Sequence, residues 1–213
     1  MEASKSLEKF HSLPNIKAGM SEGDLRKLYS LSLSQIRKHA EYGEYNYKPS
    51  SFNIRWIYGY NPKAGVINLK DCNKSEIFYA AGNCGVVYDW NREQMRILQG
   101  HRHVVLHLAT DAQGKWLVTG DSGPENIIII WDSNDYFPQR TLFSPHGNSK
   151  LAKISLSADA KYLLTLAYHD KAKLHWWIWS FGLDVPHATL EVEIPRNGVL
   201  DMSFNPNNSL QFL

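Results

Sequence analysis

Three stretches of this chain share one pattern: a strand-like apolar run, then an aromatic residue, then a small polar residue. The stretches cover residues 85–89, 127–132 and 175–180. Their aromatic residues, which lie 43 and 48 positions apart, are Tyr88, Trp131 and Trp179. A repeat of about 40–45 residues constrains the fold strongly, because each repeat is one small unit that buries its hydrophobic face on the next. The chain is therefore predicted to be an all-β protein of successive sheets, each anchored by one of these aromatic residues.

The composition excludes several classes of partner. The 213 residues carry a formal net charge of +2, which creates no strong field toward nucleic acid or anionic lipid. Two cysteines are too few for a disulfide framework, and the N-terminus lacks the apolar region of a signal peptide. No apolar run approaches the roughly 18 residues of a membrane-spanning helix. We expect an intracellular protein that binds neither nucleic acid nor membranes.

Residues 1–51 differ in composition from the rest of the chain. They are rich in Ser, Lys, Glu and Tyr and poor in β-branched residues. Apolar residues at helical spacing predict a short helix over 22–42, preceded by a disordered stretch. Such a helix either packs on the edge of the domain or serves as a docking arm for a partner. The predicted organisation is a partly helical N-terminal segment, 1–51, and a β domain, 52–213.

From residue 52 onward the pattern changes to short strands with polar turns. β-branched and aromatic runs alternate with Gly, Asn and Asp clusters, which is typical of small antiparallel sheets. The predicted strands cover residues 53–60, 76–81, 85–90, 95–98, 104–109, 116–120, 126–131, 140–143, 152–156, 162–167, 173–179, 188–194, 199–204 and 209–213. They form three four-stranded units and half of a fourth, whereas a closed ring of such units needs about four to eight. Either the chain is a fragment or truncated isoform of a longer protein, or other strands complete the arc.

One unit is bounded by a Gly-His dipeptide at 100–101 and a Trp-Asp dipeptide at 131–132. In such a unit a His, a hydroxyl residue on the second strand, an Asp in the next turn and the Trp can form a buried hydrogen-bond network. The predicted members are His101, Thr119, Asp121 and Trp131. Glu125 is an alternative to the aspartate, because the turn is enlarged. Buried polar groups must be satisfied, so we expect this network to fix the geometry of the sheet rather than to catalyse a reaction.

No catalytic, cofactor or metal site is predicted. His101, His103 and His107 share one face of a strand, but the last two would lie about 13 Å apart, too far for one zinc ion. Cys72 and Cys84 have no CxxC partner. The sequence contains neither a phosphate-binding loop nor a nucleophile elbow.

The densest aromatic cluster is Trp176-Trp177-Ile178-Trp179. Strand alternation places Trp177 and Trp179 on one face and Trp176 and Ile178 on the other. A third strand lies inside its sheet, so we expect both faces to pack between neighbouring sheets. The alternative is a binding hot spot, in which Trp is enriched.

The unit between residues 98 and 133 resembles a WD40 repeat. It carries LQGH at 98–101, KWLVTGDSGP at 115–124 and IIIIWDS at 127–133. The enlarged DSGP turn is similar to that of axonemal WD-repeat proteins, and most like the cilia- and flagella-associated WD-repeat subunit of the calmodulin- and spoke-associated complex. The resemblance covers residues 52–213 and implies a WD40 β-propeller arc of about three blades plus part of a fourth. That family also has a second propeller and a calcium-binding-like region, for which this chain has no matching motif, so calcium sensing is not implied.

The resemblance implies a non-enzymatic scaffold or adaptor in the cytoskeleton of a cilium or flagellum, where it would link radial spokes to doublet microtubules. Its partners would be other proteins, namely axonemal or radial-spoke subunits, with no small-molecule substrate and no cofactor. One alternative is a general cytoplasmic adaptor, such as a ubiquitin-ligase substrate receptor or a microtubule-associated WD protein. A third hypothesis is an enzyme that works in a central channel, for which the first strands offer only His107 and Asp201.

Overall fold

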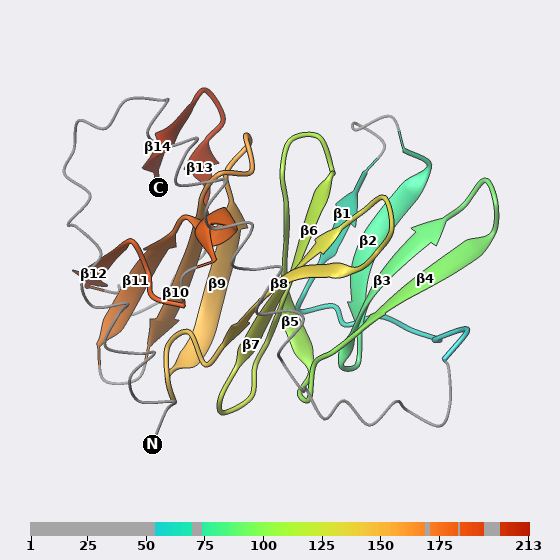
Figure 1. Ribbon diagram of the computed structural model, residues 1–213. Coiled ribbons are helices and arrows are strands. Elements are labelled where there is room, and N and C mark those ends of the chain that lie inside the picture. Colours follow the sequence, from blue (N-terminus) through green and yellow to red (C-terminus); the bar gives the residue numbers. More distant parts are fainter. Residues whose placement is uncertain (1–53, 70–73, 169–170, 183, 194–200) are drawn as a thin grey trace, which may run out of the picture. The chain divides into compact units, whose positions relative to one another are not determined.

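The computed structural model describes residues 54–69, 74–168, 171–182, 184–193 and 201–213. All of them belong to one compact unit, Asn46–Leu213. In these residues the regular structure consists of antiparallel strands and one short 3-10 helix, so the predicted all-β class is confirmed (Figure 1). No helix in the described ranges is long and apolar enough to cross a membrane. The helix predicted over 22–42 lies outside the described residues.

Each of the first three sheets is a meander, in which four strands that follow one another along the chain pair with their neighbours. The first sheet consists of β1 (Val66–Asn68), β2 (Glu76–Ala81), β3 (Cys84–Asp89) and β4 (Gln94–Gln99). The second consists of β5 (Val105–Thr110), β6 (Trp116–Asp121), β7 (Ile127–Asp132) and β8 (Pro138–Phe143). The third consists of β9 (Lys150–Leu156), β10 (Leu163–Tyr168), β11 (Ala172–Trp177) and β12 (Ala188–Val192), with the 3-10 helix η2 (Trp179–Phe181) before its last strand. A two-stranded sheet of β13 (Phe204–Asn205) and β14 (Asn208–Phe212) follows.

The second and third sheets begin with matching turns between their first two strands. In the second sheet the carboxylate of Asp111 accepts a hydrogen bond of 2.8 Å from the amide of Trp116. In the third sheet the hydroxyl of Ser157 accepts one of 2.9 Å from the amide of Tyr162. The two acceptors lie 46 positions apart and each serves the amide five residues ahead. Short polar side chains that satisfy backbone donors are typical of such turns.

Three hydrophobic clusters pack each sheet on the next. The four isoleucines of β7 belong to two of these clusters. Ile127 and Ile129 pack in the cluster shared with the first sheet, and Ile128 and Ile130 pack in the cluster shared with the third. Both faces of β7 are therefore buried, which explains a continuous apolar run instead of polar–apolar alternation. Representative members of the three clusters are Leu98 and Trp131, Ile130 and Trp177, and Leu164 and Phe204.

Three of the predicted strands are wrong or shortened. Residues 54–60 contain no strand, and the first sheet begins instead with β1. Gly59 adopts a φ of 83°, which interrupts the extended backbone within this segment. The strand predicted over 199–204 is described from residue 201 onward, where residues 201–203 are irregular and Phe204 begins β13.

The strand predicted over 173–179 ends at Trp177. Ile178, with φ −97° and ψ 80°, leads the chain into η2, and Gly182 ends that helix in the left-handed conformation. The last tryptophan of the aromatic cluster therefore lies outside the sheet.

Gly120 in β6 is packed so closely that a methyl group on its Cα would lie 2.8 Å from Cδ2 of Leu151 in the next sheet. We expect Gly120→Ala to lower the free energy of unfolding by about 1–3 kcal/mol, because this part of the core is already full. Urea titration measures the change. In a Leu151→Ala background, where the clashing atoms are gone, the same substitution should cost less. Equal costs in both backgrounds would contradict the packing described.

Candidate functional site

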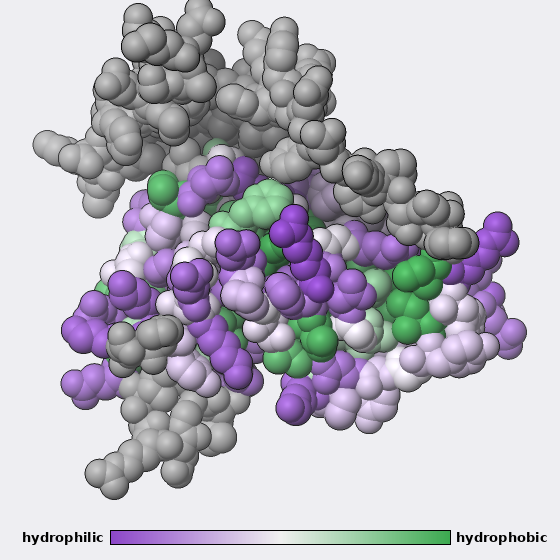
Figure 2. All heavy atoms as spheres, turned by 90° about the horizontal axis from the view of Figure 1, so that it is seen from below, coloured by the Kyte–Doolittle hydropathy of each residue, from purple (hydrophilic) through white to green (hydrophobic). Residues whose placement is uncertain are grey.

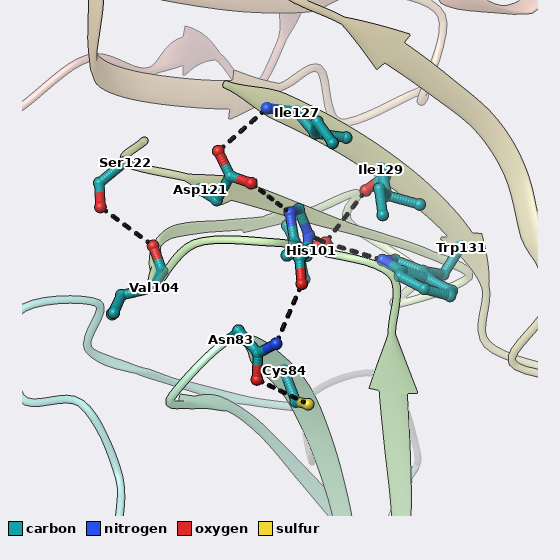
Figure 3. A network of polar contacts seen from close by, with 10 residues as sticks. Asn83, Cys84, His101, Val104, Asp121, Ser122, Ile127, Ile129 and Trp131 are labelled. Carbon is teal, nitrogen blue, oxygen red and sulfur yellow. Dashed lines mark hydrogen bonds and ion pairs between the residues drawn. The ribbon is translucent and has the colours of Figure 1, made fainter. Parts of the chain in front are cut away.

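Four buried polar side chains of the second sheet and its entry loop form one network (Figure 3). Nε2 of His101 lies 2.6 Å from the hydroxyl of Thr119, and Nδ1 of the same ring lies 3.3 Å from Oδ2 of Asp121. The indole of Trp131 donates to the Thr119 hydroxyl over 2.8 Å. The structure thus brings together the four residues that the sequence placed in one network. Glu125, the alternative to the aspartate, is exposed.

The Asp121 carboxylate fixes one ring proton of His101. A buried carboxylate only accepts, so Nδ1 of His101 carries the proton that is donated to Asp121. The Thr119 hydroxyl accepts from the indole of Trp131, and the carbonyl oxygen of Ile129 lies 3.5 Å from it as an acceptor for its proton. The imidazole and the hydroxyl therefore connect the indole on one side to the carboxylate on the other.

The Asp121 carboxylate also spans the enlarged turn between β6 and β7. Its Oδ1 accepts a hydrogen bond of 3.0 Å from the amide of Ile127. Burial alone would raise the pKa of Asp121, but the hydrogen bonds from His101 and Ile127 outweigh it and hold the pKa below its usual value. Both oxygens are engaged in closing the hairpin. The arrangement is suited to holding the sheet together rather than to chemistry on a substrate.

The third sheet holds a second network, which the sequence analysis missed. The indole of Trp177 donates to the hydroxyl of Thr165 over 2.8 Å, and Nε2 of His146 lies 2.7 Å from the same hydroxyl. These residues lie 45 or 46 positions after their counterparts in the first network. Trp177, rather than the predicted Trp179, is therefore the counterpart of Trp131. The signal that could have found it is a Thr placed 12 positions before a Trp in both units.

The second network differs from the first because it has no carboxylate. The strand register places Ala167 where Asp121 stands in the second sheet, and His175 where Ile129 stands. The rings of His146 and His175 stack, with centroids 4.0 Å apart and planes 13° from parallel. Nδ1 of each ring is buried, with no hydrogen-bond partner in the described part of the chain. Burial lowers the pKa of His146 to about 3 and also lowers the pKa of His175.

The two other predicted anchors occupy different environments. Tyr88 in β3 is half-buried, and its ring meets that of Trp56 edge-on, with centroids 6.0 Å apart. Trp179 in η2 is buried and donates to the carbonyl of Ala160 over 2.6 Å. It shares a core cluster with Trp177, whereas Trp176 packs against the cluster on the opposite face of the third sheet. The tryptophans of the aromatic cluster thus contribute to the core on both faces, as the alternation predicted.

The remaining candidate reactive residues lie apart. In the portion of the chain that the structure describes, no group of three or more His, Cys, Asp or Glu could hold a metal ion. Nε2 of His107 lies 3.1 Å from the carbonyl oxygen of Leu151, which makes it a contact between sheets. Cys84 is a buried free thiol, and burial raises its pKa. Asp201 is exposed, and Cys72 lies outside the described residues.

Two hollows open on the surface beside residues 54–63. The smaller, of about 440 Å³, is lined by Tyr58, Tyr60, Lys63 and Val104 among others. The larger, of about 620 Å³, is lined by residues that include Ile54, Arg55, Met95 and Arg96. Figure 2 views the molecule from below and shows hydrophobic residues reaching the surface between hydrophilic ones.

The geometry defines an all-β repeat protein whose polar networks are structural. Residues 52–213 match the family described as the CFAP251 N-terminal domain, and the chain belongs to that family. Among its curated relatives, "Cilia- and flagella-associated protein 251" of Mus musculus is 29% identical over 163 residues, which are 76% of this chain and 12% of the relative. The protein of the same name from Tetrahymena thermophila is 32% identical over 140 residues, 62% of this chain and 14% of the relative. That from Chlamydomonas reinhardtii is 26% identical over 181 residues, 77% of this chain and 22% of the relative.

This comparison corrects the family assignment made from sequence. The WD40-like motifs led us to expect the WD40-repeat family, but the family that matches residues 52–213 is the CFAP251 N-terminal domain. The resemblance to cilia- and flagella-associated proteins agrees with the names of the relatives. The chain spans less than a quarter of the length of those relatives.

Thr119→Val tests the first network, because valine keeps the shape of the side chain and removes only the hydroxyl. The substitution leaves the indole of Trp131 and Nε2 of His101 without a partner. Buried polar groups that lose their partner cost about 1–3 kcal/mol each, so we expect the free energy of unfolding to fall by about 2–4 kcal/mol. Thermal and urea unfolding measure the loss. Thr119→Ser, which retains the hydroxyl, is the control and should be clearly more stable than the valine variant.

The stacked histidines predict a stability that depends on pH. His146, His175 and His107 all have a pKa below the ordinary 6.5, and that of His107 is about 4. The unfolded chain therefore binds more protons than the folded one below pH 6.5, and stability should fall as the pH drops from about 6.5 toward 3. The charge of Lys173 acts in the same direction on both stacked rings.

His175→Ile, which copies the equivalent residue of the second sheet, should reduce this pH dependence. His107 remains in the variant, so part of the slope should persist. Urea unfolding between pH 7.5 and 5 measures it, with His103→Gln as a control outside the pair. An unchanged slope in the His175→Ile protein would show that the pair does not govern acid stability.

Proposed function

We propose that this chain is a non-enzymatic scaffold or adaptor of the ciliary or flagellar axoneme, and that it helps to link radial spokes to doublet microtubules. The observation that carries the proposal is membership of a family whose curated relatives are named cilia- and flagella-associated proteins. The network of His101, Thr119, Asp121 and Trp131 supports it, because its donors and acceptors are engaged with one another. In this proposal its partners are other proteins, with no role for nucleic acid, membrane or a small-molecule substrate.

We also propose that the successive sheets are blades of a β-propeller arc. Each of three sheets is a four-stranded meander, and hydrophobic clusters join neighbouring sheets. The His–Thr–Trp network recurs after 45 or 46 residues in the adjacent sheet. Such an arc presents several loops on a rigid frame, which suits a protein that holds more than one partner.

The location can be tested with the tagged full chain expressed in a ciliated cell. If the proposal holds, the protein stays with the axoneme after detergent removes the ciliary membrane and soluble matrix. The tag alone is the control and should be extracted. Quantitative cross-linking of isolated axonemes then tests the partners, and links to radial-spoke and doublet subunits are expected. Complete extraction with the matrix, or links confined to other complexes, would contradict the proposal.

A further inference from the structure

A row of large apolar side chains is exposed along residues 54–60, which we call the aromatic ridge. Its members Ile54, Trp56, Tyr58 and Tyr60 are 44%, 45%, 90% and 60% exposed. They stand at alternate positions of a segment whose pattern predicted a strand. The ring centroids of Trp56 and Tyr58 lie 6.4 Å apart, and Tyr58 and Tyr60 line one hollow. Scattered exposed apolar residues need no explanation, but neighbouring ones mark an interaction surface.

A hollow lies at each end of the aromatic ridge. Tyr58 and Tyr60 border the hollow of about 440 Å³, where Val104 is 47% exposed. Ile54 and Arg55 border the hollow of about 620 Å³. Concave sites beside aromatic side chains are where an apolar anchor of a partner can be buried. The surface therefore offers two anchor positions joined by a ridge of aromatic rings.

Contacts to the first two sheets hold the ridge in place. The amide of Asn61 donates to the carbonyl of Ala80 over 2.7 Å, and its side-chain amide donates to the carbonyl of Val105 over 2.9 Å. In the middle of the ridge, the amide of Ile57 donates to the sulfur of Met95 over 3.3 Å. A surface fixed in this way loses little conformational freedom when it binds a partner.

The charges around the ridge indicate the kind of partner. Arg55 and Arg96 line the larger hollow together with the carboxylate of Asp135, and Lys63 lines the smaller one. One oxygen of that carboxylate already accepts the amide of Phe137 over 2.9 Å. The excess of positive over negative side chains around the hollows favours an acidic ligand, because rim charges of opposite sign steer association and exclude wrong partners.

Charge also argues against two other molecules that could cover the ridge, namely residues 1–53 of this chain and a second copy of the chain. Residues 1–53 contain eight Lys or Arg and six Asp or Glu, so this segment of the chain is not the acidic partner that the ridge requires. A second copy placed ridge to ridge would oppose cation to cation. An acidic segment of a different protein fits both the charge and the apolar anchor sites.

We propose that the aromatic ridge and its two hollows are a docking surface for an acidic polypeptide segment of another protein, which places one apolar side chain in each hollow. This inference does not depend on the ciliary assignment. It concerns a surface that the buried networks do not use.

The full chain can be tested with fluorescent synthetic peptides that carry two Phe anchors separated by Glu-rich linkers of several lengths. Fluorescence anisotropy should show binding at one preferred linker length, weakened at high NaCl. Tyr58→Ser should weaken this binding about tenfold, the effect expected for a central aromatic anchor. Because Tyr58 is 90% exposed, the substitution leaves folding intact. Tyr168→Ser in the third sheet, at a tyrosine that is 42% exposed, is the matched control and should bind normally.

A charge swap tests the electrostatic part separately. The double variant Arg55→Glu and Lys63→Glu should lose the acidic peptide and gain a peptide in which Lys replaces Glu, whereas Lys150→Glu should do neither. Failure of every acidic peptide to bind, or equal binding by the Tyr58→Ser chain, would overturn the proposal. So would a dimer, seen by analytical ultracentrifugation, that Tyr58→Ser dissociates, because the occupant would then be a second copy.

Discussion

The threonine hydroxyl between a histidine and a tryptophan is the interaction on which the second and third sheets depend. In each sheet it connects the segment that enters the sheet to the third strand through the second strand. These hydrogen bonds lie in the core, where water cannot replace a lost partner. The entry segment, the second strand and the third strand must therefore adopt their positions together. In the first sheet Tyr79 occupies the position of this threonine in the strand register.

The two networks share the His–Thr–Trp contacts but differ in the residues around them. The second sheet closes its hairpin with the Asp121 carboxylate, which accepts from both the imidazole and the Ile127 amide. The third has alanine at that position and gains a second imidazole instead. Stacked neutral rings pack well, but their buried Nδ1 atoms lack partners in the described structure. In the network with Asp121 the buried polar atoms are hydrogen-bonded. In the network with His146 and His175 two buried ring nitrogens lack a partner among the described residues, and the stability of the third sheet is expected to depend on pH.

Much of the sheet structure could be predicted from the sequence, because period-two alternation and polar turns recur where strands pair with neighbours. β2 has the predicted bounds, and most other strands differ by one or two residues. The predicted network residues meet because the Gly-His and Trp-Asp dipeptides mark fixed points of one unit. The second network was missed because Trp179 continues the aromatic alternation of Trp177, and nothing in the sequence reveals that the strand ends at the latter. The register of β10 and β11 identifies the true counterpart, and the spacing of 12 positions between Thr165 and Trp177 is the sequence signal that agrees with it.

The segment over residues 54–60 shows where pattern alone reaches its limit. Alternating apolar residues indicate that one side of an extended segment meets an apolar surface, but they do not say whether that surface belongs to the same chain. In β7, where the apolar run is continuous, the neighbouring sheets supply an apolar surface on both faces, and the four isoleucines are buried. At the aromatic ridge apolar residues alternate, Gly59 has a positive φ, no strand forms, and the side chains remain exposed. Removing apolar surface from water is favourable both in β7 and at the aromatic ridge. A pattern typical of burial that is found on the surface is therefore best explained by a partner that covers it.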